Sequence, residues 1–420
     1  MNVIPSAKKT ELNNGLTLVT EDISSVKAVA MGVMIGAGSA NETKRQGGLS
    51  HLIEHMTFKG TPKRSAYEIA KELDAVGGKM NAYTTKEYTV YYAIVLDKHI
   101  DTAVDVLSDI VLNPSLDPPA LEMEKGVILE EIKMYQDTPD ELVHDLFAQQ
   151  ILREHPIGRP TIGNADSVKG FTRDDLLDYR KDWYTPDNTI ISLAGDIPKK
   201  SRQMIEQAFG RWQGKSRKPG SIKASIKGGL FLKKKKTEQV HLCLGVRGVA
   251  QTDEERYPYA VLDNILGGNM SSRLFQEVRE KRGLVYSIFS TSTPFRDLGL
   301  SYVYAGTSKK NLEQVIELIL AQFGQIKNHG VSPEELNRAK ENMKGTLVLG
   351  LESTAARMNW LAKSEFYYGR TMTIDEIFTK VDKVTNDHVI ELAERFFRDE
   401  YLNLTVIGDL ADLPVKELHC

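Results

Sequence analysis

The chain of 420 residues carries the same pattern of residues in its two halves. In residues 26–56 and again in residues 238–266, a strand-like apolar stretch leads through a polar loop into a helix-like stretch. Ala40 and Ala250 are equivalent in this match, at an offset of 210 residues. The alternative is that all α/β halves look alike, but a near-constant offset over four segments is hard to obtain by chance. The other matching segments, at offsets of 213 to 215, are residues 116–125 and 331–340, 168–180 and 381–393, and 191–197 and 404–410.

The duplication predicts two homologous domains. Residues 211–229 between the halves are rich in Gly, Pro, Ser and Lys, which is typical of a linker. We therefore expect an N-terminal domain at residues 1–214, a linker at 215–229 and a C-terminal domain at 230–420. Such a length is also more than one typical core accommodates.

The fold class follows from the local patterns in each half. Residues 84–96 are rich in β-branched and aromatic side chains, which predicts a strand. Residues 66–78 have a helical pattern that ends on glycines. Strands come in hairpin-like runs followed by helices, which favours an α+β fold in which each domain packs helices on an antiparallel-rich sheet.

The overall charge and the cysteine content exclude several classes of protein. A formal net charge of -3 argues against a nucleic-acid or membrane-surface role. No apolar run reaches the length of a spanning helix, and the first residues lack the apolar core of a signal peptide. Only Cys243 and Cys420 are present, which fits a reducing compartment. We expect a cytoplasmic protein.

The segment Gly47–Thr61, with the sequence GGLSHLIEHMTFKGT, holds two of the nine histidines. On a helix, His51, Glu54 and His55 share one face and the apolar residues share the other. Two imidazoles at i and i+4 can bind one divalent ion, and a neighbouring carboxylate can deprotonate a water. The order HxxEH is the inverted form of the zinc motif HExxH. The alternative is an ordinary solvated polar face.

A third ligand is needed, because catalytic zinc usually takes three protein ligands. Residues 117–137 predict a helix opened by two prolines, with an exposed face centred on Glu122, Lys125, Lys133 and Gln136. Glu124 and Glu131 then point inward, where a carboxylate needs a partner. Periodicity leaves two readings open: a metal ion, or a buried Lys or Arg.

These residues resemble the pitrilysin and mitochondrial-processing-peptidase family of inverted zinc peptidases, most closely its bacterial members. The resemblance covers nearly the whole chain. It implies that His51, His55 and Glu131 bind one Zn²⁺, for which Co²⁺ or Mn²⁺ can substitute. It also implies that Glu54 is the general base and that Glu124 orients the ligands.

The family resemblance extends to substrate contacts. Arg279 and Tyr286 resemble the Arg and Tyr with which the family's C-terminal part grips the substrate and assists at the scissile carbonyl. Residues 81–93 resemble its substrate-pairing edge strand, in which Asn81 is a candidate backbone contact. Without the resemblance, an exposed Arg and a Tyr at a strand start would be read as surface and packing residues.

The second half lacks the metal motif. It therefore keeps the predicted fold without the site. In the repeat alignment, His51, Glu54, His55 and Glu131 correspond to Val261, Asn264, Ile265 and Thr346.

The resemblance implies a metalloendopeptidase that cleaves unfolded peptides or N-terminal segments, bound in extended form. It implies a clam-like pair of domains and a homodimer that encloses a chamber. The alternative is a non-catalytic structural or regulatory subunit of the same fold. Such family members have lost parts of HxxEH, whereas the four residues His51, Glu54, His55 and Glu131 are all present here.

Overall fold

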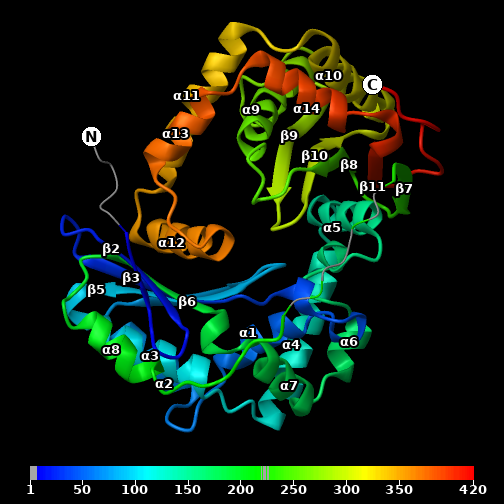
Figure 1. Ribbon diagram of the computed structural model, residues 1–420. Coiled ribbons are helices and arrows are strands. Elements are labelled where there is room, and N and C mark those ends of the chain that lie inside the picture. Colours follow the sequence, from blue (N-terminus) through cyan, green and yellow to red (C-terminus); the bar gives the residue numbers. More distant parts are fainter. Residues whose placement is uncertain (1–6, 219, 221–223, 225–226) are drawn as a thin grey trace. The chain divides into compact units, whose positions relative to one another are not determined.

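The computed structural model describes residues 7–218, 220, 224 and 227–420 (Figure 1). The chain forms two compact units, and each takes one segment from the other half of the sequence. Unit 1 comprises Met1–Lys133, Arg159–Ser221 and Val348–Ile374, and unit 2 comprises Met134–Gly158, Ile222–Leu347 and Asp375–Cys420.

The contiguous domains predicted at 1–214 and 230–420 differ from these units in two exchanged helices. Helix α12 (Thr354–Tyr368) belongs to unit 1, and helix α5 (Pro139–Leu152) belongs to unit 2. Each helix buries apolar side chains on the sheet of its unit: Met358 and Leu361 of α12, and Phe147 of α5. In the predicted linker 215–229, residues 219, 221–223 and 225–226 lie outside the described part of the chain.

Unit 1 is built on a six-stranded sheet in the order β1-β2-β6-β3-β5-β4. Neighbouring strands are antiparallel except β2 and β6, which are parallel. β4 lies at an edge of the sheet. The strands are β1 (Lys8–Glu11), β2 (Thr17–Asp22), β3 (Ala28–Ile35), β4 (Lys79–Thr84), β5 (Thr89–Leu96) and β6 (Thr189–Gly195).

Both faces of this sheet are covered by helices, as Figure 1 shows for α12 on one side and the other helices of unit 1 on the opposite side. Strand β3 reads AVAMGVMI because both faces are buried. Val29, Met31 and Val33 join the core beneath α1 and α3, whereas Ala30 packs with α12. The helices on the face opposite α12 are α1 (Leu49–Thr57), α2 (Ala66–Ala75), α3 (Ile100–Leu112), α4 (Pro118–Gln136), α6 (Ala165–Gly170), α7 (Arg173–Trp183) and α8 (Ser201–Phe209).

The structure tests the helix predicted at 66–78 and the strand predicted at 84–96. The helix expected at 66–78 is α2, which ends at Ala75, shortly before Gly77 with φ +66°. The strand expected at 84–96 is confirmed over residues 89–96 as β5, but its predicted start is wrong, because β4 ends at Thr84 and a turn separates the two strands. Thr85 makes this turn: its hydroxyl accepts hydrogen bonds from the backbone N–H groups of Glu87 and Tyr88.

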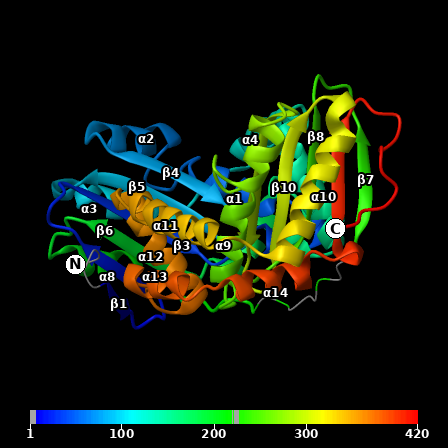
Figure 2. The same ribbon diagram turned by 90° about the horizontal axis from the view of Figure 1, so that it is seen from above.

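Unit 2 repeats the arrangement with a five-stranded sheet in the order β7-β11-β8-β10-β9 (Figure 1), and Figure 2 shows β7, β8 and β10 of this sheet from above. Strands β7, β11, β8, β10 and β9 occupy the places of β2, β6, β3, β5 and β4 in unit 1, again with one parallel pair. The predicted duplication and the α+β fold class are confirmed. The strands are β7 (Gly229–Lys234), β8 (Val240–Gly248), β9 (Val285–Pro294), β10 (Gly299–Thr307) and β11 (Asn403–Gly408).

The helices of unit 2 enclose a second apolar core. Among the described residues, no helix combines the length and the apolar character that crossing a membrane requires. The helices besides α5 are α9 (Arg256–Leu266), α10 (Leu312–His329), α11 (Pro333–Gly350), α13 (Ile374–Asp382) and α14 (Asn386–Phe396).

A buried carboxyl in α9 predicts a pH-dependent stability. Burial raises the pKa of Asp263 from 3.8 to about 6. The folded state therefore holds the proton more tightly than the unfolded state, so the free energy of unfolding should fall by roughly 3 kcal/mol as the pH rises from about 3 to about 7. In urea titrations across that pH range, Asp263→Asn should remove this fall in the free energy of unfolding. The same change at the exposed Asp297 should leave the fall unchanged. An unchanged pH profile for Asp263→Asn would contradict the expectation.

Candidate metal centre

Helix α1 carries the two histidines and begins at a fixed point. Gly48 precedes it with φ +94°, and a Cβ there would approach the carbonyl oxygen of Ile162 to 2.5 Å. The buried carboxylate of Glu42 accepts hydrogen bonds from the backbone N–H of Gly48 at 2.9 Å and of Ser50 at 2.7 Å. Burial raises the pKa of Glu42 to about 7, against these bonds. The helix is thus capped by a side chain that its own first turn does not supply.

The two faces of α1 are those that the sequence predicted. The apolar face is fully buried and consists of Leu49, Leu52, Ile53 and Met56. His51, Glu54 and His55 lie on the other, partly buried face. The two imidazole centroids are 4.5 Å apart.

Helix α4 matches the helix predicted at 117–137, and Glu124 is buried as expected. Glu131 is partly exposed, with 37% of its side chain accessible, on the side that meets the histidines. Lys125 was expected on the exposed face, which is wrong. It is buried because its ammonium group reaches the carboxylate of Glu122 at 2.7 Å and the carbonyl of Lys169.

The structure brings His51, His55 and Glu131 together. One ligand atom from each lies within 4.8 Å of the others, and this is the only such group of three among the described residues. Nε2 of His51 is 3.9 Å from Oε1 of Glu131, and Nε2 of His55 is 3.9 Å from Oε2. These separations are too long for hydrogen bonds and leave room for an ion between the groups.

The chemistry of these groups fits a divalent ion. Burial, and secondly the nearby His55, lowers the pKa of His51 to about 4, so its imidazole is neutral and offers a lone pair. Its buried Nδ1 has no hydrogen-bond partner in the described structure. Two imidazoles and one carboxylate form a donor set of the kind found in catalytic zinc sites.

Glu124 contacts the site from behind His55. Its Oε1 lies 2.9 Å from Nδ1 of His55, and its Oε2 accepts a hydrogen bond from Nζ of Lys59 at 2.7 Å. Periodicity left open whether a metal ion or a Lys or Arg is the partner of Glu124. The structure shows that the partner is a lysine, and that Glu124 also contacts the candidate ligand His55. Sequence reasoning missed Lys59, although its position four residues after His55 was a usable signal.

Glu54 is held by the edge strand. Thr84, the last residue of β4, donates its hydroxyl to Oε2 of Glu54 at 2.5 Å. Burial raises the pKa of Glu54, opposed by the bond from Thr84 and by His55, with Glu131 as a further neighbouring charge. Glu54 thus lies beside the candidate ligands, with one carboxylate oxygen engaged.

Asn81 lies exposed on β4, three residues before Thr84. Its side-chain oxygen accepts a hydrogen bond from the N–H of Ala82 at 2.8 Å. No hydrogen bond between Asn81 and the three candidate ligands is found among the described residues.

Arg279 and Tyr286 belong to unit 2 and form a pair there. The Arg279 guanidinium lies 5.9 Å from the centroid of the Tyr286 ring and 4.8 Å from that of Phe275. The Tyr286 side chain is 78% exposed. The Tyr286 side chain is therefore available at the surface of its unit, and the partly buried Arg279 lies beside it.

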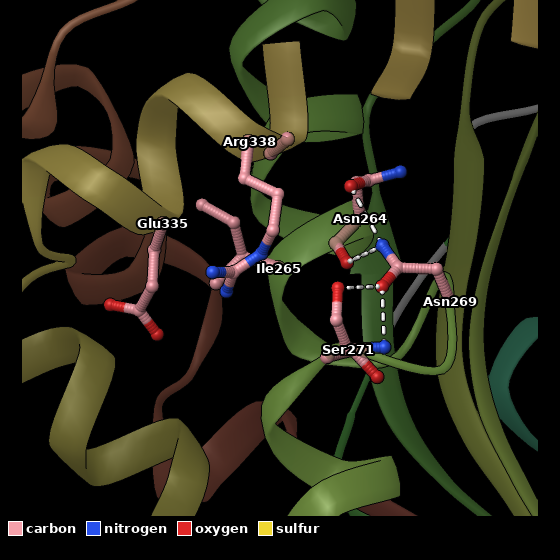
Figure 3. Close-up of a pocket in the computed structure, with 8 residues that line it drawn as sticks. Asn264, Ile265, Asn269, Ser271, Glu335 and Arg338 are labelled. Atoms are coloured by element: carbon pink, nitrogen blue, oxygen red, sulfur yellow. Dashed lines mark hydrogen bonds between the residues drawn. The ribbon is translucent and has the colours of Figure 1, made fainter. Parts of the chain in front are cut away.

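The equivalent place in unit 2 has a pocket with different chemistry (Figure 3). Asn264, which replaces Glu54, accepts hydrogen bonds from Asn269, and Glu335 is engaged by Arg273 through two bonds. The cavity measures about 10 Å³, which holds about one water molecule. The second half therefore has a small pocket at the equivalent helix position but, in its described residues, lacks the candidate metal ligands.

Comparison with known proteins gives the family. Residues 17–165 match the model of the insulinase family of peptidases, M16, and residues 170–343 match the M16 inactive domain. An uncharacterized zinc protease, YmxG, of Bacillus subtilis is 42% identical over 97% of this chain and 99% of its own length. Another, SCO5738 of Streptomyces coelicolor, is 39% identical over 99% of this chain and 92% of its own length.

Two solved structures share the fold. A protease from Helicobacter pylori superposes with a TM-score of 0.91 at 20% identity, over 96% of this chain and all of its own. A peptidase M16 inactive domain from Pseudomonas fluorescens gives 0.90 at 19% identity, over 99% of this chain and all of its own. Together with the family models and the close relatives, these findings show that the chain belongs to peptidase family M16, the pitrilysin family that its HxxEH motif resembles.

Proposed function

We propose that this protein is a zinc-dependent endopeptidase that hydrolyses unfolded peptides or N-terminal segments at the site on α1. The observation that carries the proposal is the convergence of His51, His55 and Glu131, with Glu54 on the same helix face. Two relatives named zinc proteases, similar over nearly their whole length, support the same conclusion. Co²⁺ or Mn²⁺ is expected to substitute for zinc.

In this proposal His51 Nε2, His55 Nε2 and one oxygen of Glu131 hold the ion. Bound zinc supplies a Lewis acid that polarises the scissile carbonyl and makes a neighbouring water more acidic. Glu54 takes a proton from the attacking water and later gives it to the leaving amine. The bond from Thr84 to one carboxylate oxygen of Glu54 leaves the other oxygen for this proton transfer.

The substrate contacts are proposed from the edge strand and from unit 2. β4 has a strand neighbour on one side only, so an extended peptide can add to its open edge through backbone hydrogen bonds. Asn81 lies on this strand. Arg279 and Tyr286 are proposed to grip the substrate backbone and to assist at the scissile carbonyl.

The proposal is tested by digesting a pool of unfolded peptides with the purified protein. We expect cleavage that a chelator abolishes and that added Zn²⁺ restores, and we expect a folded control protein to stay intact. The absence of cleavage by zinc-loaded wild-type protein would contradict the proposal and favour the alternative, a non-catalytic subunit of the same fold.

We further propose a homodimer that encloses a chamber, in which Arg279 and Tyr286 of one chain complete the site of the other. Glu54→Gln chains and Arg279→Ala chains, each with low activity, are mixed under conditions that allow exchange of subunits. Up to about one intact site per mixed dimer should be recovered. The absence of any recovery would exclude a site completed by the partner.

Thr84 gives a prediction on the general base. Thr84→Val removes the hydroxyl that holds Glu54 but keeps the shape of the side chain. Because a hydrogen bond to a charged group contributes about 1.5–3 kcal/mol, kcat should fall about tenfold or more, with KM little changed. Thr84→Ser keeps the hydroxyl and should retain most activity. Equal activity of the Val and Ser variants would show that this bond has no catalytic role.

A further inference from the structure

Lys59, which the proposed mechanism does not use, is connected to the metal centre through one side chain. Glu124 divides its two carboxylate oxygens between His55 Nδ1 at 2.9 Å and Lys59 Nζ at 2.7 Å. The side chain of Glu124 is only 4% exposed, whereas that of Lys59 is 33% exposed. Lys59, Glu124 and His55 thus form a row of contacting side chains. This row ends at His55 Nε2, which faces Glu131.

The negative charge of the buried Glu124 carboxylate explains why this row of side chains includes a lysine. A buried carboxylate without a cation is costly, and an imidazole that binds a metal ion through Nε2 carries no charge of its own and supplies only a hydrogen bond. Lys125 follows Glu124 directly and is itself buried, but its ammonium group contacts Glu122 and Lys169. Among the described contacts, Lys59 is the cation that reaches Glu124.

Position makes Lys59 suitable for this role. It follows the end of α1 by two residues, and its backbone N–H donates to the carbonyl of Met56 at 3.1 Å. The imidazole of His55 and the ammonium group of Lys59 therefore come from one rigid stretch and meet one carboxylate of α4. With a partner at each oxygen, the Glu124 carboxylate is fixed in rotation, and it fixes the ring of His55 in turn.

We propose that Lys59 is a positioning residue of the metal centre, which acts on His55 through Glu124 and sets the affinity of the site for its ion. The inference rests on the metal centre proposed above. Lys59 lies in the loop after the HxxEH helix and is neither a proposed metal ligand nor the proposed base.

The loss of Lys59 should therefore weaken metal binding. Lys59→Met keeps the length of the side chain but removes the charge and the donor. The loss of a group that orients a ligand typically lowers metal affinity 10- to 100-fold, and we expect an increase of about tenfold in the Kd for Zn²⁺. Lys59→Arg keeps both charge and donor and should bind zinc within about twofold of wild type.

The test measures Zn²⁺ binding to the metal-free full-length protein by competition with a chromophoric chelator. The thermal unfolding of each metal-free variant and the visible spectrum of its Co²⁺ form are recorded beside it. Lys63→Met is the matched control, because it removes the same charge from an exposed position of the same loop. Glu124→Gln with and without Lys59→Met shows whether the effect passes through Glu124, in which case the second change adds little to the first.

The outcomes separate this inference from the proposed function. A tenfold higher Kd and an altered Co²⁺ spectrum in folded Lys59→Met, rescued by Lys59→Arg, support it. Wild-type affinity and spectrum in Lys59→Met overturn it and leave the metal centre standing. Wild-type protein that binds no zinc overturns the metal centre and the inference together. Should Lys59→Met not fold, Lys59→Gln is measured in the same way, and an unchanged Kd overturns the inference there too.

Discussion

Glu54→Gln is expected to lower kcat for peptide hydrolysis by a factor of about 10²–10⁴, the usual contribution of a positioned general base. The amide keeps the size of the side chain and can still accept the hydrogen bond from Thr84. It cannot take a proton from water. Because Glu54 is not among the three converging ligands, the variant should still bind one zinc ion per chain.

Steady-state kinetics on one fluorogenic peptide and a metal analysis of the same sample check both parts of this prediction. Glu130→Gln is the control, because Glu130 is an exposed carboxylate of α4 that pairs with Lys133. Activity near wild type in zinc-loaded Glu54→Gln would reject Glu54 as the base. Loss of zinc together with activity would instead place Glu54 in the metal-binding set.

Arg64→Met should lower the free energy of unfolding by about 3–5 kcal/mol, because it leaves a buried carboxylate without its cation. Arg64 bonds to Glu72, Asp105 and Asp109, and so ties the loop after α1 to α2 and α3. Glu72 and Asp105 are half-exposed, and water can solvate them. Asp109 is the costly partner, since its side chain is 1% exposed.

Urea unfolding of the metal-free protein measures this change. Arg202→Met removes an exposed pair with Glu206 and should cost less than about 1 kcal/mol. In Arg64→Met, the additional change Asp109→Asn removes the unpaired charge and should recover part of the loss. A cost for Arg64→Met no larger than that for Arg202→Met would show that the buried Asp109 does not need its cation.

Much of the candidate metal centre was predicted from helical periodicity and motif spacing. Because a helix repeats every 3.6 residues, the sequence placed His51, Glu54 and His55 on one face of α1 and turned Glu124 inward on α4. The partner of Glu131 could not be assigned in this way. Periodicity gives the direction of a side chain within its own helix, and the distance between two helices depends on the packing of both.

The partners of these residues were missed for the same reason. Lys59, Thr84 and Glu42 reach the site from a loop, a strand end and a turn, where no period applies. The turn at Thr85 was hidden because β-branched and aromatic residues continue on both sides of it.

The exchange of α5 and α12 between the units was also not predicted. An amphipathic helix shows in its sequence that it must cover an apolar surface, but it does not show which of two similar sheets it covers. The duplication made this choice harder to read, because both sheets present the same order of strands.

The central claim is that His51, His55 and Glu131 bind one catalytic ion. A crystal structure of the zinc-loaded protein, with anomalous data collected on both sides of the zinc absorption edge, tests it most directly. We expect one zinc per chain at about 2.0–2.2 Å from Nε2 of His51, Nε2 of His55 and an oxygen of Glu131. Zinc bound at other residues, with these three side chains free of metal in zinc-saturated protein, would contradict the account.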